Sequence, residues 1–135
     1  MEMMSFFSLM FLRTKFLKNG DIYIKKVFMK RYEVYWVDLN PTKGSEINKT
    51  RPCVIISPDE LNKHLKTVVV APLTSQVRDY YPFRLKVKMG GKEGQIAIDQ
   101  IRVVDKSRLQ GLLDELTEDD AEKLRELLNE MFCVK

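Results

Sequence analysis

Short apolar and alternating runs fill the middle of the chain, and they predict β-strands. Residues 33–38 are rich in β-branched and aromatic side chains and end at the turn signal Asn40-Pro41. The runs 54–56 and 67–71 are continuously apolar, mostly β-branched and too short for helices. We therefore expect both runs to be buried strands.

A hairpin is expected in the second half of the chain. Residues 83–88 alternate apolar and basic positions, as in an antiparallel strand with its basic face in water. The glycine-rich residues 90–94 predict a turn, after which 95–99 return as the partner strand. Residues 101–104 then continue as a further strand, and residues 59–66 predict one or two helical turns.

The pattern changes to a helical period near the C-terminus. Thr117 is placed as an N-cap, with Asp120 in the capping-box position and acidic residues in the first turn. One face of the predicted helix is apolar. This face consists of Ala121, Leu124, Leu127, Leu128 and Met131. The fold class that follows is mainly β, a small bent antiparallel barrel covered by a C-terminal helix.

The organisation we expect is one domain at 29–135 preceded by an extension at 1–28. The apolar run 3–12 is about half the ~20 residues that a membrane span needs, and it lacks the charge order of a signal peptide. Three interpretations remain for the extension: a loose arm, a basic amphipathic surface segment, or an upstream start that is not used, with Met29 as the alternative. We expect no membrane association and a cytoplasmic location.

Charge is unevenly distributed along the chain, although the net charge is only +4. Residues 31–113 carry 14 basic and nine acidic side chains, a balance of +5, whereas residues 114–135 carry three basic and eight acidic ones, a balance of −5. A basic body suits a polyanionic partner.

Metal and thiol chemistry have little support in the sequence. The single histidine, His64, has no orienting partner in view and is interpreted as a surface residue. Cys53 and Cys133 have no ligand-like spacing and are expected to be free, buried thiols. We expect no metal site and no cofactor.

Two loops remain as candidates for chemistry. The polar loop before Val54 ends at Arg51, which the following proline holds at the start of a buried strand, and the loop after Ala71 presents two hydroxyls and an amide. The first loop offers Lys43, Ser45, Glu46, Asn48, Lys49, Thr50 and Arg51, and the second offers Thr74, Ser75 and Gln76. On composition alone, turn capping and surface ion pairing explain these residues better than a functional site does.

Four sequence blocks, taken in order, favour a functional site. They are YWVDLNP at 35–41, GSEINKTRPCV at 44–54, APLTS at 71–75 and DQIRVVDKSRL at 99–109. In this order and approximate spacing the chain resembles the MazF/PemK mRNA-interferase toxins, over about residues 30–132. The resemblance implies an SH3-like (PemK/CcdB-type) barrel, a homodimer, cleavage of single-stranded RNA, and neutralisation by a separately encoded acidic antitoxin.

Matching the blocks residue by residue gives the expected site. The resemblance places the catalytic residues at Arg51, Thr74 and Glu46. RNA-binding positions are expected at Lys43, Ser45, Thr50, Ser75, Gln76, Asp99 and Gln100. Where the family often has glycines between the Glu and the Arg-Pro step, this chain has INKT at 47–50, so loop shape and base preference are expected to differ.

The expected reaction uses the 2′-hydroxyl of RNA as nucleophile and needs no metal. Arg51 would stabilise charge on the phosphorane, Thr74 would donate to a non-bridging oxygen, and Glu46 would act as base or orient Arg51. Tyr80, Tyr81 or Phe83 are candidates for stacking bases, with core or dimer packing as the alternative. Two other functions stay open: a CcdB-like gyrase-poisoning toxin that acts by binding through its C-terminal helix, and an RNA-binding barrel without activity.

Overall fold

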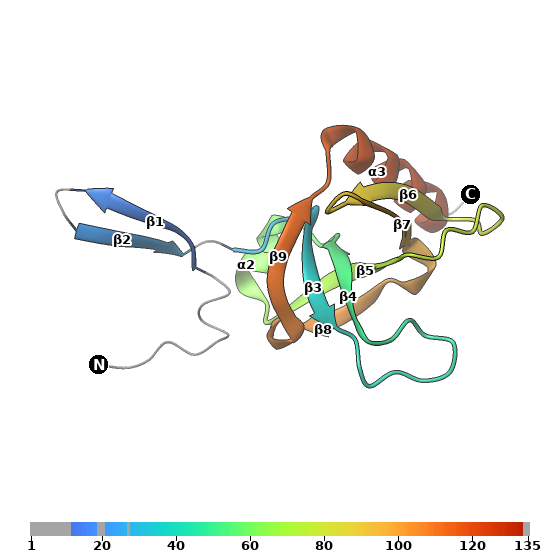
Figure 1. The fold of residues 1–135 in the computed structure, drawn as a ribbon, viewed down its shortest axis with the longest axis horizontal. Helices are drawn as coiled ribbons and strands as arrows, with labels where there is room; N and C mark the ends of the chain where they lie inside the picture. The colour runs from blue at the N-terminus through green and yellow to red at the C-terminus, as the bar shows by residue number, and fades with distance from the viewer. Residues whose placement is uncertain (1–11, 19–20, 27, 134–135) are drawn as a thin grey trace.

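A curled antiparallel sheet forms the body of the protein. The computed structural model describes residues 12–18, 21–26 and 28–133 (Figure 1). The strands follow the spatial order β6-β7-β5-β4-β3-β9, and β8 pairs with β5 beside that path. Their bounds are β3 Glu33–Asp38, β4 Thr50–Ile55, β5 Thr67–Thr74, β6 Arg84–Met89, β7 Lys92–Ala97, β8 Arg102–Asp105 and β9 Leu109–Glu115.

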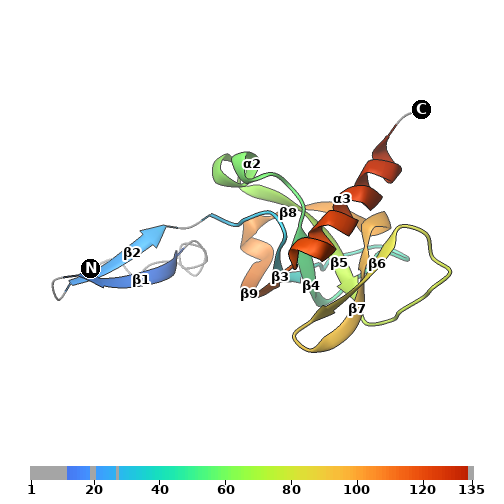
Figure 2. The same cartoon turned by 90° about the horizontal axis from the view of Figure 1, so that it is seen from above.

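Short helical elements connect the strands, and one longer helix ends the described chain. The helices are α2 Asp59–His64, the 3-10 turns η1 Ile98–Gln100 and η2 Lys106–Arg108, and α3 Glu118–Phe132. The Thr117 hydroxyl accepts a hydrogen bond from the Asp120 amide at 3.1 Å, as the N-cap prediction requires. Figure 2 shows α3 running across one side of the sheet near β6. The predicted mainly β barrel with a C-terminal helix is therefore confirmed.

Part of the predicted extension has structure that the sequence pattern did not indicate. Strands β1 Leu12–Lys18 and β2 Asp21–Lys26 pair as an antiparallel hairpin. The rest of the predicted extension up to residue 27 (1–11, 19–20 and 27) lies outside the described residues, so its interpretation stays a prediction.

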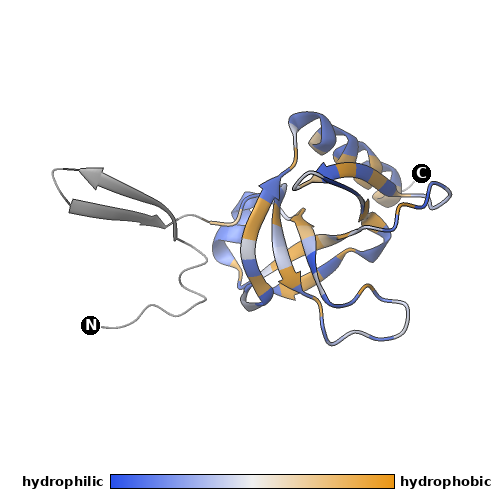
Figure 3. Ribbon diagram, viewed as in Figure 1, coloured by the Kyte–Doolittle hydropathy of each residue, from blue (hydrophilic) through white to orange (hydrophobic). Residues whose placement is uncertain are grey.

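Alternate positions of the central strands supply two apolar cores, one on each face of the sheet. The core under α3 is built around Val34, Val54, Ala71, Leu73, Val87, Met89, Ile96, Ile98, Leu116, Ala121 and Leu124. The core on the opposite face is built around Met29, Tyr35, Val37, Leu39, Cys53, Ile55, Val68, Val70, Val104 and Leu109. Figure 3 shows the resulting alternation of hydrophobic and hydrophilic positions along the strands and around α3. This two-sided burial fixes the register of β3, β4 and β5.

Four details of the sequence prediction need correction. The turn between β6 and β7 is shorter than residues 90–94, because Gly90 and Gly91 both have positive φ, 57° and 78°, and close a two-residue hairpin turn. Strand β9 was not predicted. The side chain of Arg84, expected in water, is only 9% exposed because it pairs with Asp99. Cys133, expected to be buried, is exposed because it follows the last turn of α3.

Candidate functional site

Neighbouring strands bring Arg51 and Thr74 together. Strands β4 and β5 pair in antiparallel register, with Cys53 opposite Pro72 and Val54 opposite Ala71. Continued by two residues, the same register places Arg51 opposite Thr74. Directly opposed residues of an antiparallel pair point to one face with Cβ atoms about 5 Å apart. Both residues accordingly line the same two cavities.

The first cavity is polar and has a volume of about 440 Å³. Four segments line it: the loop before β4 with the start of β4, the end of β5 with the loop that follows, the start of β6, and the end of η1. Its lining residues are Gly44, Ser45, Glu46, Ile47, Asn48, Arg51, Thr74, Ser75, Gln76, Arg78, Tyr81, Arg84 and Gln100. Three guanidinium groups and one carboxylate give this cavity the charge that an anionic ligand requires.

The second cavity lies on the other side of the Arg51–Thr74 pair and is mostly apolar. Its volume is about 500 Å³. It is lined by Trp36, Lys49, Thr50, Arg51, Pro52, Leu73, Thr74, Ser75, Met89, Gly90, Lys92, Glu93, Gly94 and Leu113. Trp36 is 40% exposed, so an indole face is available beside the guanidinium. Arg51, Thr74 and Ser75 line both cavities and so connect them.

The side chain of Arg51 is fixed by its own loop. Its Nε donates a hydrogen bond to the Asn48 carbonyl at 2.7 Å. This bond leaves the two terminal nitrogens of the guanidinium for a ligand. A planar fork of donors with a permanent positive charge is the group that fits a phosphate best among side chains.

Thr74 ends β5 and is held closely from two directions. Its Oγ1 accepts a hydrogen bond from the Gln76 amide at 3.2 Å, so the hydroxyl hydrogen remains for another acceptor. In the neighbouring strand, a Cβ at Gly94 would lie 3.0 Å from the Thr74 carbonyl oxygen. The missing side chain at Gly94 therefore permits the close approach of β7 to Thr74.

The loop that carries Glu46 is anchored at its base by two arginines that are distant in the sequence. Arg102 Nη1 donates to the Leu39 carbonyl at 3.0 Å, and Arg108 Nη1 donates to the carbonyls of Asp38, at 3.1 Å, and Asn40. Within the loop, the Ile47 amide donates to Gln100 Oε1 at 3.4 Å. The charged hydrogen bonds hold the start of the loop before Glu46, and the neutral bond of Ile47 holds the residue that follows Glu46.

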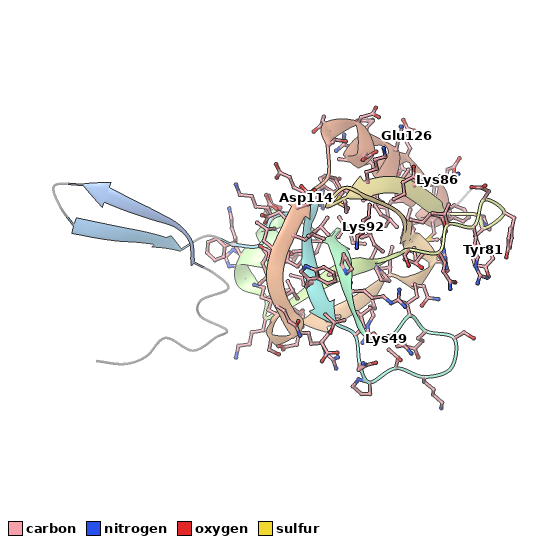
Figure 4. The ribbon with its side chains drawn as sticks, in the orientation of Figure 1. Lys49, Tyr81, Lys86, Lys92, Asp114 and Glu126 are labelled. Carbon is pink, nitrogen blue, oxygen red and sulfur yellow. The ribbon has the colours of Figure 1, made fainter. Side chains whose placement is uncertain are left out.

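The loop between β5 and β6 brings aromatic and basic groups to the polar cavity. Arg84 forms a bidentate pair with Asp99 at 2.9 and 3.1 Å, and its guanidinium carbon lies 4.7 Å from the Tyr81 ring centroid. Arg78 lies 5.2 Å from the same centroid. Figure 4 shows Tyr81 on this loop and Lys49 on the loop that precedes β4. Tyr80 is largely exposed and meets Tyr81 edge to face, whereas Phe83 packs against the core under α3.

The structure brings most of the expected site residues together. The polar cavity contains the three expected catalytic residues, Arg51, Thr74 and Glu46, and four of the expected binding residues. Those four are Ser45, Ser75, Gln76 and Gln100. The remaining three lie elsewhere: Thr50 lines the apolar cavity, Asp99 is engaged by Arg84, and Lys43 lines neither cavity although its carbonyl accepts from the Glu46 amide at 3.3 Å.

Several residues of the site were missed in the sequence. Arg78, Arg84, Arg102 and Arg108 lie in separate segments, and their roles depend on contacts across the fold. One signal was available for Arg78, which stands near two tyrosines in a polar loop, a combination typical of single-stranded nucleic-acid binding.

The buried thiol next to the site is not a nucleophile. Burial raises the pKa of Cys53 to about 12, and the nearby charges of Arg102 and Arg51 oppose this only in part. The thiol therefore stays protonated at neutral pH. Across the described residues, there is no group of three or more His, Cys, Asp and Glu side chains arranged to hold a metal ion. His64 is exposed at the end of α2, as expected.

Membrane insertion through a helix has no support in the described part of the chain. No helix there is long and apolar enough to cross a bilayer.

Comparison with known proteins identifies close relatives of this chain. The family model for PemK-like, MazF-like toxins of type II toxin–antitoxin systems matches residues 30–132. A protein from Staphylococcus saprophyticus named endoribonuclease MazF is 36% identical over 106 residues, which cover 75% of this chain and 86% of that protein.

Solved structures share the fold at lower sequence identity. A crystal structure of MazF from Deinococcus radiodurans has a TM-score of 0.70 at 24% identity and covers 81% of this chain and 100% of that one. An endoribonuclease in complex with its cognate antitoxin from Mycobacterial species has a TM-score of 0.66 at 24% identity, over 79% of this chain and 97% of that one. The same barrel with a terminal helix is thus present in both.

Proposed function

The chain belongs to the family of PemK-like, MazF-like toxins of type II toxin–antitoxin systems, and from this membership we propose that it is a metal-independent endoribonuclease that cuts single-stranded RNA at specific short sequences. One observation carries the proposal: Arg51 and Thr74 lie on two paired strands and line one polar cavity together with Glu46. A phosphate in this cavity would meet a guanidinium and a hydroxyl from two different strands.

The reaction we propose takes its nucleophile from the substrate. The 2′-hydroxyl oxygen attacks the adjacent phosphorus, the bond from phosphorus to the 5′ oxygen breaks, and the products are a 2′,3′-cyclic phosphate and a 5′-hydroxyl. The proton of the 2′-hydroxyl goes to Glu46, the departing 5′ oxygen takes a proton from water, and Glu46 afterwards returns its proton to water, so the products contain the same atoms as the substrate. Glu46 suits this role because it is exposed on the wall of the cavity, within a loop anchored at its base.

Stabilisation of the transition state is assigned to Arg51 and Thr74. The negative charge on the phosphorane grows on the non-bridging oxygens, where the terminal nitrogens of Arg51 and the Thr74 hydroxyl would donate hydrogen bonds. Because the hydrogen bond of Arg51 Nε to Asn48 orients the guanidinium before RNA binds, little reorganisation remains for the chemical step. DNA lacks the 2′-hydroxyl and is expected to bind without being cut.

The partners we propose follow from the family and from charge. A relative of this fold is in complex with its cognate antitoxin, and we propose that an acidic antitoxin segment likewise covers the basic cavity of this chain and excludes RNA. We further propose a homodimer and a cytoplasmic location. The acidic helix α3 contributes no residue to either cavity, which leaves the basic surface free for these ligands.

Incubation of the purified protein with a long single-stranded RNA in EDTA tests the activity. We expect discrete fragments with 5′-hydroxyl ends, and their sequenced ends give the cleavage motif. Arg51→Ala should abolish the fragments while the circular dichroism spectrum stays unchanged, and the matched variant Arg125→Ala, on α3, should cut normally.

The outcomes separate the candidate functions. Cutting by Arg51→Ala at the wild-type rate contradicts the site assignment, and dependence on added divalent metal contradicts metal independence. Inhibition of DNA supercoiling without RNA cleavage would instead identify a gyrase-directed toxin, and RNA binding without any cleavage an inactive barrel.

A further inference from the structure

Arg78 is an arginine whose backbone is fixed by a buried side chain. The Arg78 amide donates to Gln95 Oε1 at 3.0 Å, and Gln95 Nε2 donates to the Arg78 carbonyl at 3.4 Å. Gln95 is only 2% exposed and stands opposite Thr74 in the sheet. The amide of Gln95 therefore ties the loop that carries Arg78 to the strand that lies against Thr74.

The Arg78 side chain is also fixed, but only by neutral groups. Its Nη1 donates to the Tyr81 hydroxyl at 2.8 Å, and its Nη2 donates to Gln76 Oε1 at 3.1 Å. The guanidinium carbon lies 5.2 Å from the Tyr81 ring centroid. The neighbouring carboxylate, Asp79, is engaged by Lys86.

This arrangement differs from that of other arginines in the molecule. Arg84 is paired with Asp99, and Arg125 is paired with Glu118 and Glu122. None of the ion pairs within residues 28–133 includes Arg78. Its positive charge is thus held in a fixed place on the polar cavity and is not neutralised by an ion pair among these residues.

An ordered arginine without a counter-charge is arranged for an anion. Immobilising an arginine side chain on binding costs rotamer entropy, and in Arg78 the side chain is already ordered before any ligand binds. The other residues of the cavity indicate that the anion is part of a nucleic acid strand. Arg51 and Thr74 are placed for one phosphate, and the ring of Tyr81 beside Arg78 is placed for a base.

We propose that Arg78 binds a second phosphate of the RNA strand, on a nucleotide that flanks the one being cut. Gln95 acts as its positioning residue, and Tyr81 and Gln76 hold the guanidinium toward the cavity. This inference rests on the proposed endoribonuclease function. In this inference Arg78 binds the RNA strand and fixes its position along the cavity, whereas Arg51 and Thr74 act on the phosphate that is cut.

The expected phenotype is a loss of binding without a loss of chemistry. Arg78→Gln should raise KM about 10-fold and leave kcat within about 2-fold, because the groups around the scissile phosphate are untouched. The slope of log affinity against log salt should become shallower by about 0.7, the value for one phosphate contact to a single strand. Arg125→Gln removes the same charge on α3 and should change neither quantity.

RNA with single uncharged phosphate linkages can identify the phosphate that Arg78 contacts. The probe is an RNA oligonucleotide that contains the mapped cleavage site, made uncleavable by 2′-O-methylation at the cut, with one methylphosphonate linkage placed at each position in turn. We expect one linkage, distinct from the scissile one, whose neutralisation weakens wild-type binding about 10-fold and does not weaken Arg78→Gln binding further.

The result that overturns the inference is an equal effect of every neutral linkage on wild-type and Arg78→Gln protein. A change in kcat with unchanged KM and salt slope in this variant would also overturn it, because Arg78 would then act in the chemical step or through the fold. If the wild-type protein cuts no RNA, the proposed function fails and this inference fails with it. If the wild-type protein cuts RNA and Arg78→Gln has the same KM and salt slope, only the inference is overturned.

Discussion

The backbone around Thr74 is packed so closely that a single methyl group is expected to disturb it. A Cβ at Gly94 would stand 3.0 Å from the Thr74 carbonyl oxygen, which forces the two strands apart by a few tenths of an ångström. Small displacements of catalytic groups have large kinetic costs. Gly94→Ala is therefore expected to lower the RNA cleavage rate about 10-fold.

A second glycine provides the matched control. Gly111 lies in the interior of β9, and a Cβ there meets nothing within 4 Å. Gly111→Ala should cut at the wild-type rate, and both variants should melt within a few degrees of the wild type. Equal activity of the two variants would show that the spacing between β7 and Thr74 is unimportant.

The two thiols should differ strongly in reactivity. Cys133 is exposed, whereas Cys53 is buried with its pKa raised to about 12. At pH 8 a disulfide reagent should titrate one thiol rapidly and the second only after unfolding, and Cys133→Ser should remove the rapid phase. Two rapid thiols in the folded protein would contradict the burial of Cys53.

The raised pKa also has a consequence for alkaline stability. The folded state keeps the Cys53 proton at a pH where the unfolded chain, with a thiol pKa near 9.0, has lost it. The stabilising contribution is therefore complete below about pH 9 and is lost as the pH rises toward 12. Cys53→Ala should flatten the decline of the unfolding free energy over this interval.

At the scale of residues, some members of the candidate site could be predicted from the sequence and others could not. Local signals place Arg51 and Thr74 at the ends of apolar strands next to polar loops, and the resemblance of the sequence blocks selects them as site residues. Asp99 was expected to face RNA but is engaged by Arg84, fifteen residues away. The roles of Arg78 and Gly94 depend on Gln95 and Thr74 across the sheet, and no local pattern contains that information.

Among the elements, the loop between β3 and β4 depends on a residue that is distant in the sequence and adjacent in the sheet. Arg108 donates to the carbonyls of Asp38 and Asn40, where the loop begins. Arg108→Met keeps the aliphatic stem and removes these bonds. We expect kcat to fall about 10-fold with KM within about 2-fold, and the free energy of unfolding to fall by about 1–2 kcal/mol.

Arg108→Lys distinguishes positioning from folding. A lysine can donate to one of the two carbonyls, so it should restore part of kcat. If Arg108→Met lowers stability as expected but leaves kcat unchanged, the anchor serves the fold alone.

Elements with a clear local period were predicted, and those that depend on distant pairing were not. Helix α3 combines a capping residue with an apolar face, and its position follows from the sequence. Strand β9 lacks alternation and contains Gly111 and two acidic residues, so it has no local strand signal. It forms because β3 pairs with it, with Tyr35 opposite Leu112, a partner 77 positions along the chain.

On the scale of the whole molecule, the proposed homodimer makes a direct prediction. Sedimentation equilibrium at micromolar concentration should give twice the mass of one chain. The measured mass should stay constant on dilution over the range in which RNA is cut, because closed twofold assembly is the commonest form of a symmetric oligomer. A fully active protein with the mass of a single chain would refute the dimer.

Strand β5 lies in the middle of the sheet. It pairs with β4 on one side and with β8 and then β7 on the other, and Thr74 is its last residue. Amide protons along β5 should therefore exchange with solvent only when the entire barrel opens, and denaturant should abolish cleavage in the same transition as the fold. Local unfolding of a strand end would therefore not switch off cleavage in such a protein. Inhibition would need a second molecule that covers the surface where RNA binds.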